Sequence, residues 1–285
     1  FVMGIDSGGS KTVCLAATTD GQVIACGRAG GGAAVNASVD ARESVAAAIS
    51  QVLAIAGKIP QHVFISLGGL NTEEISAVVR VILPDSEIRL ERESNGVVVL
   101  DCAPYWGFHV AVLAGTGSVA LGINARGKRS SLGGWGHLLD DRGSGYAVGR
   151  DALRALTESI DGRREWTPFM PALLQRAPFT PSETIMQILL TPQASWTTAK
   201  RAQVREHVKQ TLPRFDRQAI AQLAPLVSKF AQAGDITAFQ IYAQAGSDLA
   251  ALAYAVIDSL ALPEANVIGI GGMFQAGAVL RTPFA

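Results

Sequence analysis

A short stretch near the start of the chain, "VMGIDSGGSKTV" (2–13), combines a carboxylate, two adjacent glycines and several hydroxyl groups. Glycines allow a phosphate to approach the backbone closely, and consecutive free N–H groups can hold an anion. Asp6 is a candidate ligand for hydrated Mg²⁺, because this ion keeps several waters and takes few carboxylates. The stretch also suits an ordinary hairpin with a polar tip. As a phosphate-binding element it offers these candidate residues: Gly8, Gly9, Ser10, Lys11 and Thr12.

The spacing of this stretch differs from that of the phosphate-binding loops that precede a helix. A P-loop has Gly-Lys-Ser/Thr after its four-residue gap, whereas here Ser10 separates Gly9 from Lys11. β-branched residues and an Asp20-Gly21 turn follow, where a P-loop or a dinucleotide-binding motif needs a helix. We therefore expect a strand, a glycine turn and a second strand, then another turn and a third strand.

The same layout returns at 108–131, "FHVAVLAGTGSVALGINARGKRSS". An apolar run over 110–113 leads into the turn Gly115-Thr116-Gly117-Ser118, and a second apolar run and a second turn follow. Two such hairpins, each opening one half of the chain, predict a duplicated α/β protein with both tips facing one cleft. The domain boundary is expected near residue 107.

A third glycine cluster lies in "ANVIGIGGMFQAG" (265–277), after an Ala- and Leu-rich segment that predicts a helix over roughly 236–260. The cluster itself is predicted as a buried strand that runs into Gly271-Gly272 and then a helix. A glycine pair at such a junction allows a flat ring to lie against the backbone. It equally suits a tight turn.

The composition limits the classes of partner and of cellular location. The chain has 285 residues with 24 Lys+Arg and 24 Asp+Glu, so no charge excess favours a nucleic acid or an anionic membrane. Its three scattered cysteines show neither a disulfide framework nor metal-ligand spacing. No stretch approaches the ~20 apolar residues of a spanning helix, and no signal-peptide pattern opens the chain. A cytoplasmic protein is expected.

The three glycine elements, in this order, resemble the nucleotide-binding motifs of the actin-like ATPase/sugar-kinase superfamily. Within it, the chain resembles the N-acetylglucosamine kinase branch, the BadF/BadG-type ATPase family, above all in "GGWGHLLDDRGSGYAVGR" (133–150). The resemblance implies a duplicated actin-like, ribonuclease H-like α/β fold with lobes 1–107 and 108–285 and a nucleotide cleft between them. It is weakest over about 155–235, which we interpret as a helical insertion.

The resemblance also implies ATP and Mg²⁺ as cofactors, an amino sugar as the small-molecule substrate, and a homodimer. It assigns phosphate contacts to Thr116, Gly117 and Ser118, and adenosine contacts to Gly271 and Gly272. The residues that it assigns to the sugar are Asn36, Gly134, Trp135 and Asp141. Three of these residues have a structural alternative, in which Asn36 is a turn residue, Trp135 a core aromatic and Asp141 a helix N-cap.

The catalytic base is the open question of the sequence. In the family an Asp opens the helix before the second hairpin. One alignment places Asn95 at this position, and a second, in which the helix begins at Asp101, makes Asp101 the base. An Asn amide can bind a hydroxyl but cannot take its proton. The expected activity is phosphorylation of N-acetylglucosamine to its 6-phosphate. The alternatives are a kinase for glucosamine or a related sugar, and a catalytically weak sugar and nucleotide sensor.

Overall fold

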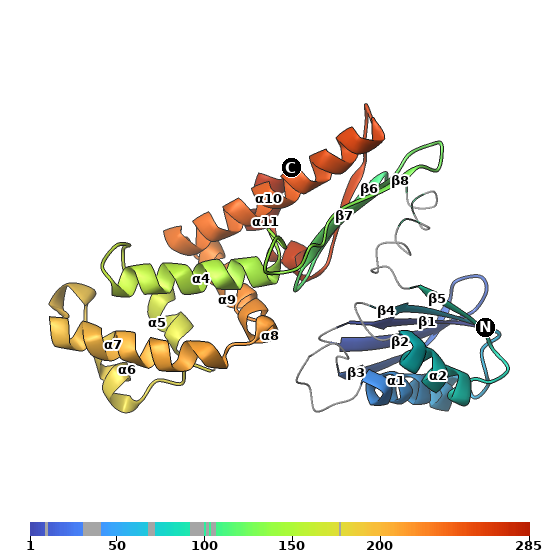
Figure 1. Ribbon diagram of the computed structural model, residues 1–285, viewed down its shortest axis with the longest axis horizontal. Coiled ribbons are helices and arrows are strands. Elements are labelled where there is room, and N and C mark those ends of the chain that lie inside the picture. The colour runs from blue at the N-terminus through green and yellow to red at the C-terminus, as the bar shows by residue number, and fades with distance from the viewer. Residues whose placement is uncertain are drawn as a thin grey trace. The chain divides into compact units, whose positions relative to one another are not determined.

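The computed structural model describes residues 1–8, 11–30, 41–67, 72–91, 100, 103, 107–176 and 178–285 (Figure 1). The chain divides into two compact units, Phe1–Cys102 and Ala103–Ala285. The division therefore lies between 102 and 103, whereas the sequence favours a boundary near 107. Each unit has a separate hydrophobic core and is described by itself.

The first unit contains a five-stranded sheet with the order β3-β2-β1-β4-β5. β1, β2 and β3 form the predicted antiparallel meander, β4 joins β1 in parallel, and β5 joins β4 in parallel. Alternate residues of β1 are buried, as expected for a strand with one face on a core. Gly21, at the predicted turn, has a φ of +92°. The strands span Val2–Ser7, Lys11–Ala17, Val23–Gly30, His62–Leu67 and Glu87–Glu91.

Two helices, α1 (Ala41–Ala56) and α2 (Thr72–Ile82), supply the rest of the first core. α1 packs so closely on β3 that a Cβ at Gly27 would overlap the carbonyl oxygen of Ala48. Buried positions on α1 recur at three- and four-residue spacing, which gives the helix one apolar face.

The second unit repeats the arrangement of the first sheet. Its four strands have the order β8-β7-β6-β9, in which β6, β7 and β8 form an antiparallel meander and β9 joins β6 in parallel. This order matches β3-β2-β1-β4 of the first unit, so the predicted duplication is confirmed at the level of topology. The strands span Val110–Ala114, Ser118–Ile123, Arg129–Gly133 and Val267–Ile270.

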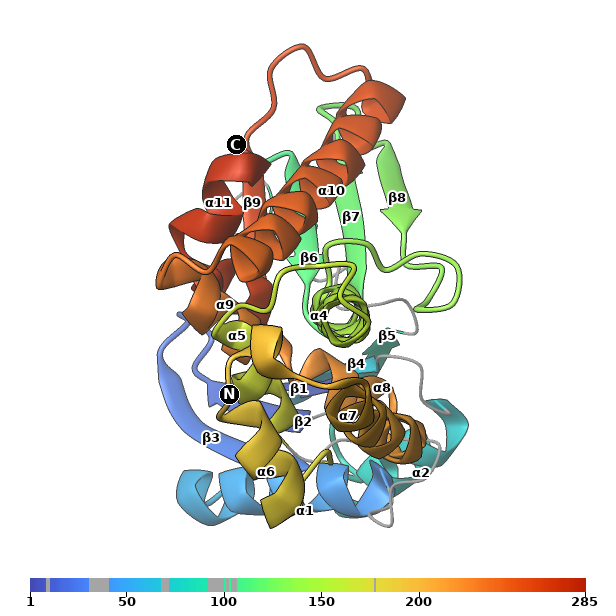
Figure 2. The same ribbon diagram turned by 90° about the vertical axis from the view of Figure 1, so that its left-hand side faces the viewer.

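Helices make up most of the remaining second unit, including the segment that the sequence interprets as a helical insertion. α10 coincides with the predicted helix over 236–260 and packs along β6, β7 and β8 (Figure 2). None of the described helices is long and apolar enough to cross a bilayer. The helices are α4 (Gly145–Ile160), α5 (Phe169–Leu174), α6 (Glu183–Leu189), α7 (Thr198–Thr211), α8 (Arg217–Ala221), α9 (Ala224–Gln232), α10 (Ile236–Leu260) and α11 (Ala278–Phe284), with 3-10 turns η1 (Gln193–Ser195), η2 (Leu212–Arg214) and η3 (Gly272–Ala276).

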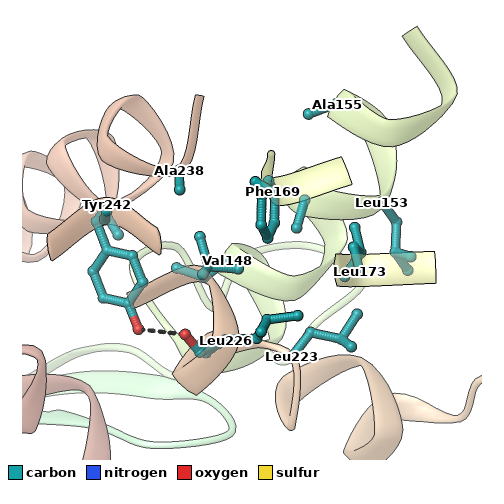
Figure 3. Packing of buried hydrophobic residues seen from close by; sticks show 14 of the residues in the cluster. Val148, Leu153, Ala155, Phe169, Leu173, Leu223, Leu226, Ala238 and Tyr242 are labelled. Carbon is teal, nitrogen blue, oxygen red and sulfur yellow. Dashed lines mark hydrogen bonds between the residues drawn. The ribbon is translucent and has the colours of Figure 1, made fainter. Parts of the chain in front are cut away.

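The core of the second unit joins α4, α5, α9 and α10 (Figure 3). Tyr242 of α10 is buried and its hydroxyl donates to the carbonyl oxygen of Ala224 over 2.9 Å. Asp235 caps α10 by accepting from two backbone N–H groups, and its second oxygen accepts from the N–H of Phe169. These polar contacts fix α9, α10 and α5 to one another around the apolar side chains.

Candidate functional site

The first glycine hairpin joins β1 to β2. The backbone N–H of Gly8 donates to the carbonyl oxygen of Lys11 over 3.0 Å, and Lys11 itself is exposed. Ser7 and Thr12 are fully buried, and their hydroxyl oxygens lie 2.8 Å apart. In the described part of this hairpin, Lys11 is therefore at the surface, while the Thr12 hydroxyl is buried and hydrogen-bonded to Ser7. Gly9 and Ser10 lie outside the described residues.

Asp6 lies on β1, half-buried, directly opposite Val13 of β2. Across the described ranges, no three or more His, Cys, Asp or Glu side chains lie close enough together to hold a metal ion by themselves. Mg²⁺ bound with a nucleotide does not need such a group, because waters and phosphate oxygens supply most of its ligands. One carboxylate on the hairpin strand is compatible with that chemistry, and the role of Asp6 stays a prediction.

The second glycine hairpin joins β6 to β7 and is described completely. Gly115 donates its N–H to the carbonyl oxygen of Gly117 over 2.9 Å, which closes the turn. Over the described part of the chain, the backbone N–H groups of Thr116 and Gly117 have no hydrogen-bond partner. Both residues are partly exposed. Adjacent amides of this kind can bind an anion, so the donor set fits a phosphate group.

A buried carboxylate lies beside this hairpin. Asp141 accepts a 3.3 Å hydrogen bond from the N–H of Ser118 through Oδ1, and its Oδ2 lies 2.9 Å from Nη2 of Arg217. The Ser118 hydroxyl donates to the carbonyl oxygen of Arg142 over 2.7 Å. Ser118, predicted as a phosphate contact, is buried, and both its N–H and its hydroxyl hold the loop after β8.

The hairpin is also fixed to the N-terminus of α4. The N–H of Gly145 donates to the carbonyl oxygen of Gly115 over 2.7 Å, and Tyr146 donates to Thr116 over 3.3 Å. These contacts satisfy N–H groups that the first turn of a helix otherwise leaves without an intrahelical partner. Since the carbonyl groups of the tip are bound to α4, the tip has a fixed orientation.

Two of the structural alternatives for the predicted sugar residues are wrong. Trp135 has 75% of its surface exposed, so it is not a core aromatic. Asp141 does not cap a helix, because the N-cap of α4 is Ser144, whose hydroxyl accepts from the N–H of Ala147. Gly134, directly before Trp135, has a φ of +73°, a conformation that favours glycine.

The predicted adenosine contacts Gly271 and Gly272 differ in their surroundings. Gly271 has a φ of +112°, and a Cβ there would overlap the carbonyl oxygen of Ala114 at the end of β6. Its lack of a side chain is therefore needed for backbone conformation and for close packing. A Cβ at Gly272 would meet no atom of the described residues within 4 Å, so among these residues the glycine has open space beside it.

Several of the predicted site residues lie outside the residues that the structure describes. The structure also places one residue beside the site, Arg217, that the sequence did not indicate. Asn36, Asn95 and Asp101 lie outside the described ranges. Arg217, which contacts Asp141, is separated from it by 76 residues and lies in the helical segment where the resemblance is weakest. No local motif indicates this arginine, because its place at the site depends on a contact between elements that are distant in the sequence.

Comparison with known proteins gives matches over nearly the whole chain. The sequence model of the BadF/BadG/BcrA/BcrD ATPase family matches residues 3–283. The chain is 25% identical over 302 residues to an N-acetyl-D-glucosamine kinase of Dictyostelium discoideum, covering 98% of this chain and 86% of that protein. It is also 25% identical over 300 residues to an N-acetylmuramic acid/N-acetylglucosamine kinase of Clostridium acetobutylicum, with 99% and 86% covered.

Solved structures share the fold. A Chromobacterium violaceum protein assigned as an N-acetylglucosamine kinase superposes with a TM-score of 0.71 at 23% identity, covering 100% of this chain and 90% of the other. A ROK family glucokinase from Streptomyces griseus, solved with glucose and AMPPNP, gives 0.56 at 15% identity, with 99% and 86% covered. At these identities the similarity establishes the duplicated fold of these kinases.

Proposed function

Because the chain belongs to the BadF/BadG/BcrA/BcrD ATPase family, we propose that it is a kinase that transfers a phosphoryl group from ATP to a hydroxyl of an amino sugar. N-acetylglucosamine is the proposed substrate, with glucosamine or a related sugar as the alternative. Two relatives, each matched over almost the full chain, carry names of N-acetylglucosamine kinases and support this choice.

One structural observation carries the nucleotide part of the proposal. The glycine hairpin between β6 and β7 repeats the one between β1 and β2, and its tip has two adjacent backbone N–H groups without partners in the described structure. Phosphoryl transfer depends mostly on positioning and on stabilising charge. Amides held in fixed positions supply both, because they do not need to reorganise when the phosphate binds.

The proposed roles of the remaining residues follow from their chemistry. Mg²⁺-bound ATP would supply the transferable phosphoryl group. Asp6 is the proposed carboxylate ligand of the hydrated Mg²⁺. Trp135 offers an exposed aromatic face to the sugar, beside the glycine at 134. Asp141 accepts two of the about four hydrogen bonds that a carboxylate can accept, but its side chain is only 3% exposed, so its role as acceptor for a sugar hydroxyl is proposed from the resemblance.

The proton of the attacking hydroxyl needs an acceptor, and the two candidates differ chemically. Asp101 can take the proton, whereas Asn95 can only hold the hydroxyl in place. General-base catalysis contributes about 10²- to 10⁴-fold to such a rate. If Asn95 occupies the base position, the protein keeps sugar binding and turns over slowly, which is the behaviour of a sugar and nucleotide sensor.

The test is ADP release from Mg-ATP with a panel of amino sugars, measured on the wild-type protein and on Asn95→Asp and Asp101→Ala variants. A kinase whose base is Asp101 turns over in the wild type and loses about 10²- to 10⁴-fold in Asp101→Ala. A sensor with Asn95 in the base position binds sugar and gains activity only in Asn95→Asp. Absence of Mg-ATP binding in calorimetry would remove the proposal.

A further inference from the structure

Arg217, on α8, extends its guanidinium to the tip of the second glycine hairpin. Its Nη2 lies 2.9 Å from Oδ2 of Asp141, and a Cβ at Gly117 would lie 2.9 Å from the same nitrogen. The guanidinium therefore lies directly against the backbone of the hairpin tip. The N–H groups of Thr116 and Gly117 in this tip have no partner in the described structure.

The two members of the ion pair differ in access to solvent. The Asp141 side chain is 3% exposed, whereas the Arg217 side chain is 45% exposed. A guanidinium has five N–H donors, and Arg217 uses one of them, toward Asp141, within the residues that the structure describes. The carboxylate thus anchors one side of the arginine, and the other donors stay available to a ligand at the surface.

Close helix packing fixes α8 and with it Arg217. Gly145 and Gly149 lie four residues apart and so share one face of α4. A Cβ at Gly149 would overlap the carbonyl oxygen of Ile220, and one at Gly145 would lie 3.4 Å from that of Ala221. The backbone of α8 rests directly on these glycines. Asp216 caps α8 by accepting a 2.7 Å hydrogen bond from Ala219, so the helix begins at Arg217.

We propose that Arg217 is a phosphate-binding residue of the nucleotide site, positioned by Asp141 so that its remaining donors and the two amides of the hairpin tip bind one phosphate group. This inference rests on the proposed kinase function, because it names a further residue of the same site. Arginine suits the task since its fork of donors matches the oxygens of a phosphate. Arg217 also offsets the negative charge of Asp141, which would otherwise repel a polyphosphate beside Gly117.

The experiment is calorimetric titration of the full chain with Mg-ADP and, separately, with adenosine, which lacks phosphates. Arg217→Gln removes the charge, and the double variant Arg217→Gln/Asp141→Asn also removes the buried carboxylate charge that would be left without its partner. Arg163→Gln is the matched control, because Arg163 pairs with Asp161 over 3.2 Å at the far end of α4. Thermal unfolding of each variant checks that it is folded.

We expect Mg-ADP to bind about tenfold to a hundredfold more weakly to both Arg217 variants, the range given by charge-assisted hydrogen bonds. Adenosine affinity stays at the wild-type value, and Arg163→Gln binds both ligands normally.

A folded double variant that binds Mg-ADP like the wild type would overturn the inference, since Arg217 would then only neutralise Asp141. An equal loss for adenosine and Mg-ADP would also overturn it. A wild-type protein that binds no Mg-ADP would instead refute the proposed function itself.

Discussion

Gly117 shows how much a single missing side chain contributes to the second hairpin. Its Cα lies against two charged side chains, because a Cβ there would lie 2.9 Å from Arg217 Nη2 and 2.9 Å from Asp141 Oδ1. Gly115, two residues earlier, has no atom of the described part of the chain within 4 Å of its Cβ position. Neither residue has a φ in the left-handed region. A difference in stability between alanine substitutions at these two glycines would therefore come from the space around the side chain and not from the backbone conformation.

We predict that Gly117→Ala lowers the free energy of unfolding by about 1 kcal/mol, the low end of the usual effect of overpacking. The exposed Arg217 side chain can move away at small cost, whereas the short, buried Asp141 carboxylate cannot. Arg217 must shift to make room, so Mg-ADP affinity falls as well. Gly115→Ala is the control for stability, and its effect should stay within about 0.5 kcal/mol. Urea unfolding measures both variants. Equal unfolding free energies for the two would show that the contact around Gly117 is loose.

At the scale of elements, the contact between α10 and α9 includes one buried polar group. The Tyr242 hydroxyl donates to the carbonyl oxygen of Ala224 at the start of α9, and burial raises the pKa of Tyr242 to about 12. An unfolded tyrosine has a pKa near 10. Because the folded pKa is the higher one, this group stabilises the fold fully below about pH 10 and loses its contribution as the pH rises toward 12.

We predict that Tyr242→Phe lowers the free energy of unfolding by about 1 kcal/mol near neutral pH, the net value of one hydrogen bond. The difference from the wild type should shrink above about pH 10, because only the wild type loses this phenol's contribution there. Burial also raises the pKa of the Cys14 thiol to about 12, but Cys14 titrates in both proteins and cancels in the difference. A difference that stays constant from about pH 8 to about pH 11 would contradict the prediction.

At the scale of the whole molecule, the two units have two separate cores. Ile65 is fully buried in the first core, among residues of β1, β2, β4, α1 and α2. Phe169 is fully buried in the second, packed with a tilted Phe230 ring whose centroid lies 5.7 Å away. Each side chain therefore contributes to one core, and the stability of each unit depends mainly on its own side chains.

We predict that Phe169→Ala, which removes about 3–5 kcal/mol of stability, lowers amide hydrogen-exchange protection in α4, α9 and α10 and leaves β1 and β4 protected. Ile65→Ala is the reciprocal variant, with protection lost from β1 and β4 and kept in α10. Loss of protection in both units from either variant would show that they unfold as one cooperative body.

The local elements follow from local sequence signals. The Asp20-Gly21 turn, the strands on either side of each glycine hairpin and the helix over 236–260 were all predictable, because alternation, turn residues and helix formers act over a few residues. The repeated order of motifs also predicts the duplicated sheets. The resemblance in 133–150 identifies the family, which the match over 3–283 confirms.

Contacts between distant segments were decided only by the tertiary structure. Nothing in the sequence around Arg217 relates it to Asp141, and nothing around Asp141 shows that it holds the hairpin rather than a helix end. Likewise, the Gly145–Gly149 spacing on α4 gains its meaning only once α8 packs on it. The sequence alone thus determined the repeated strands, the glycine turns and the family, since these depend on short-range patterns. The tertiary structure decided which charge neutralises the buried carboxylate and which amides have no partner among the described residues, since burial and pairing depend on elements that meet only in the folded chain.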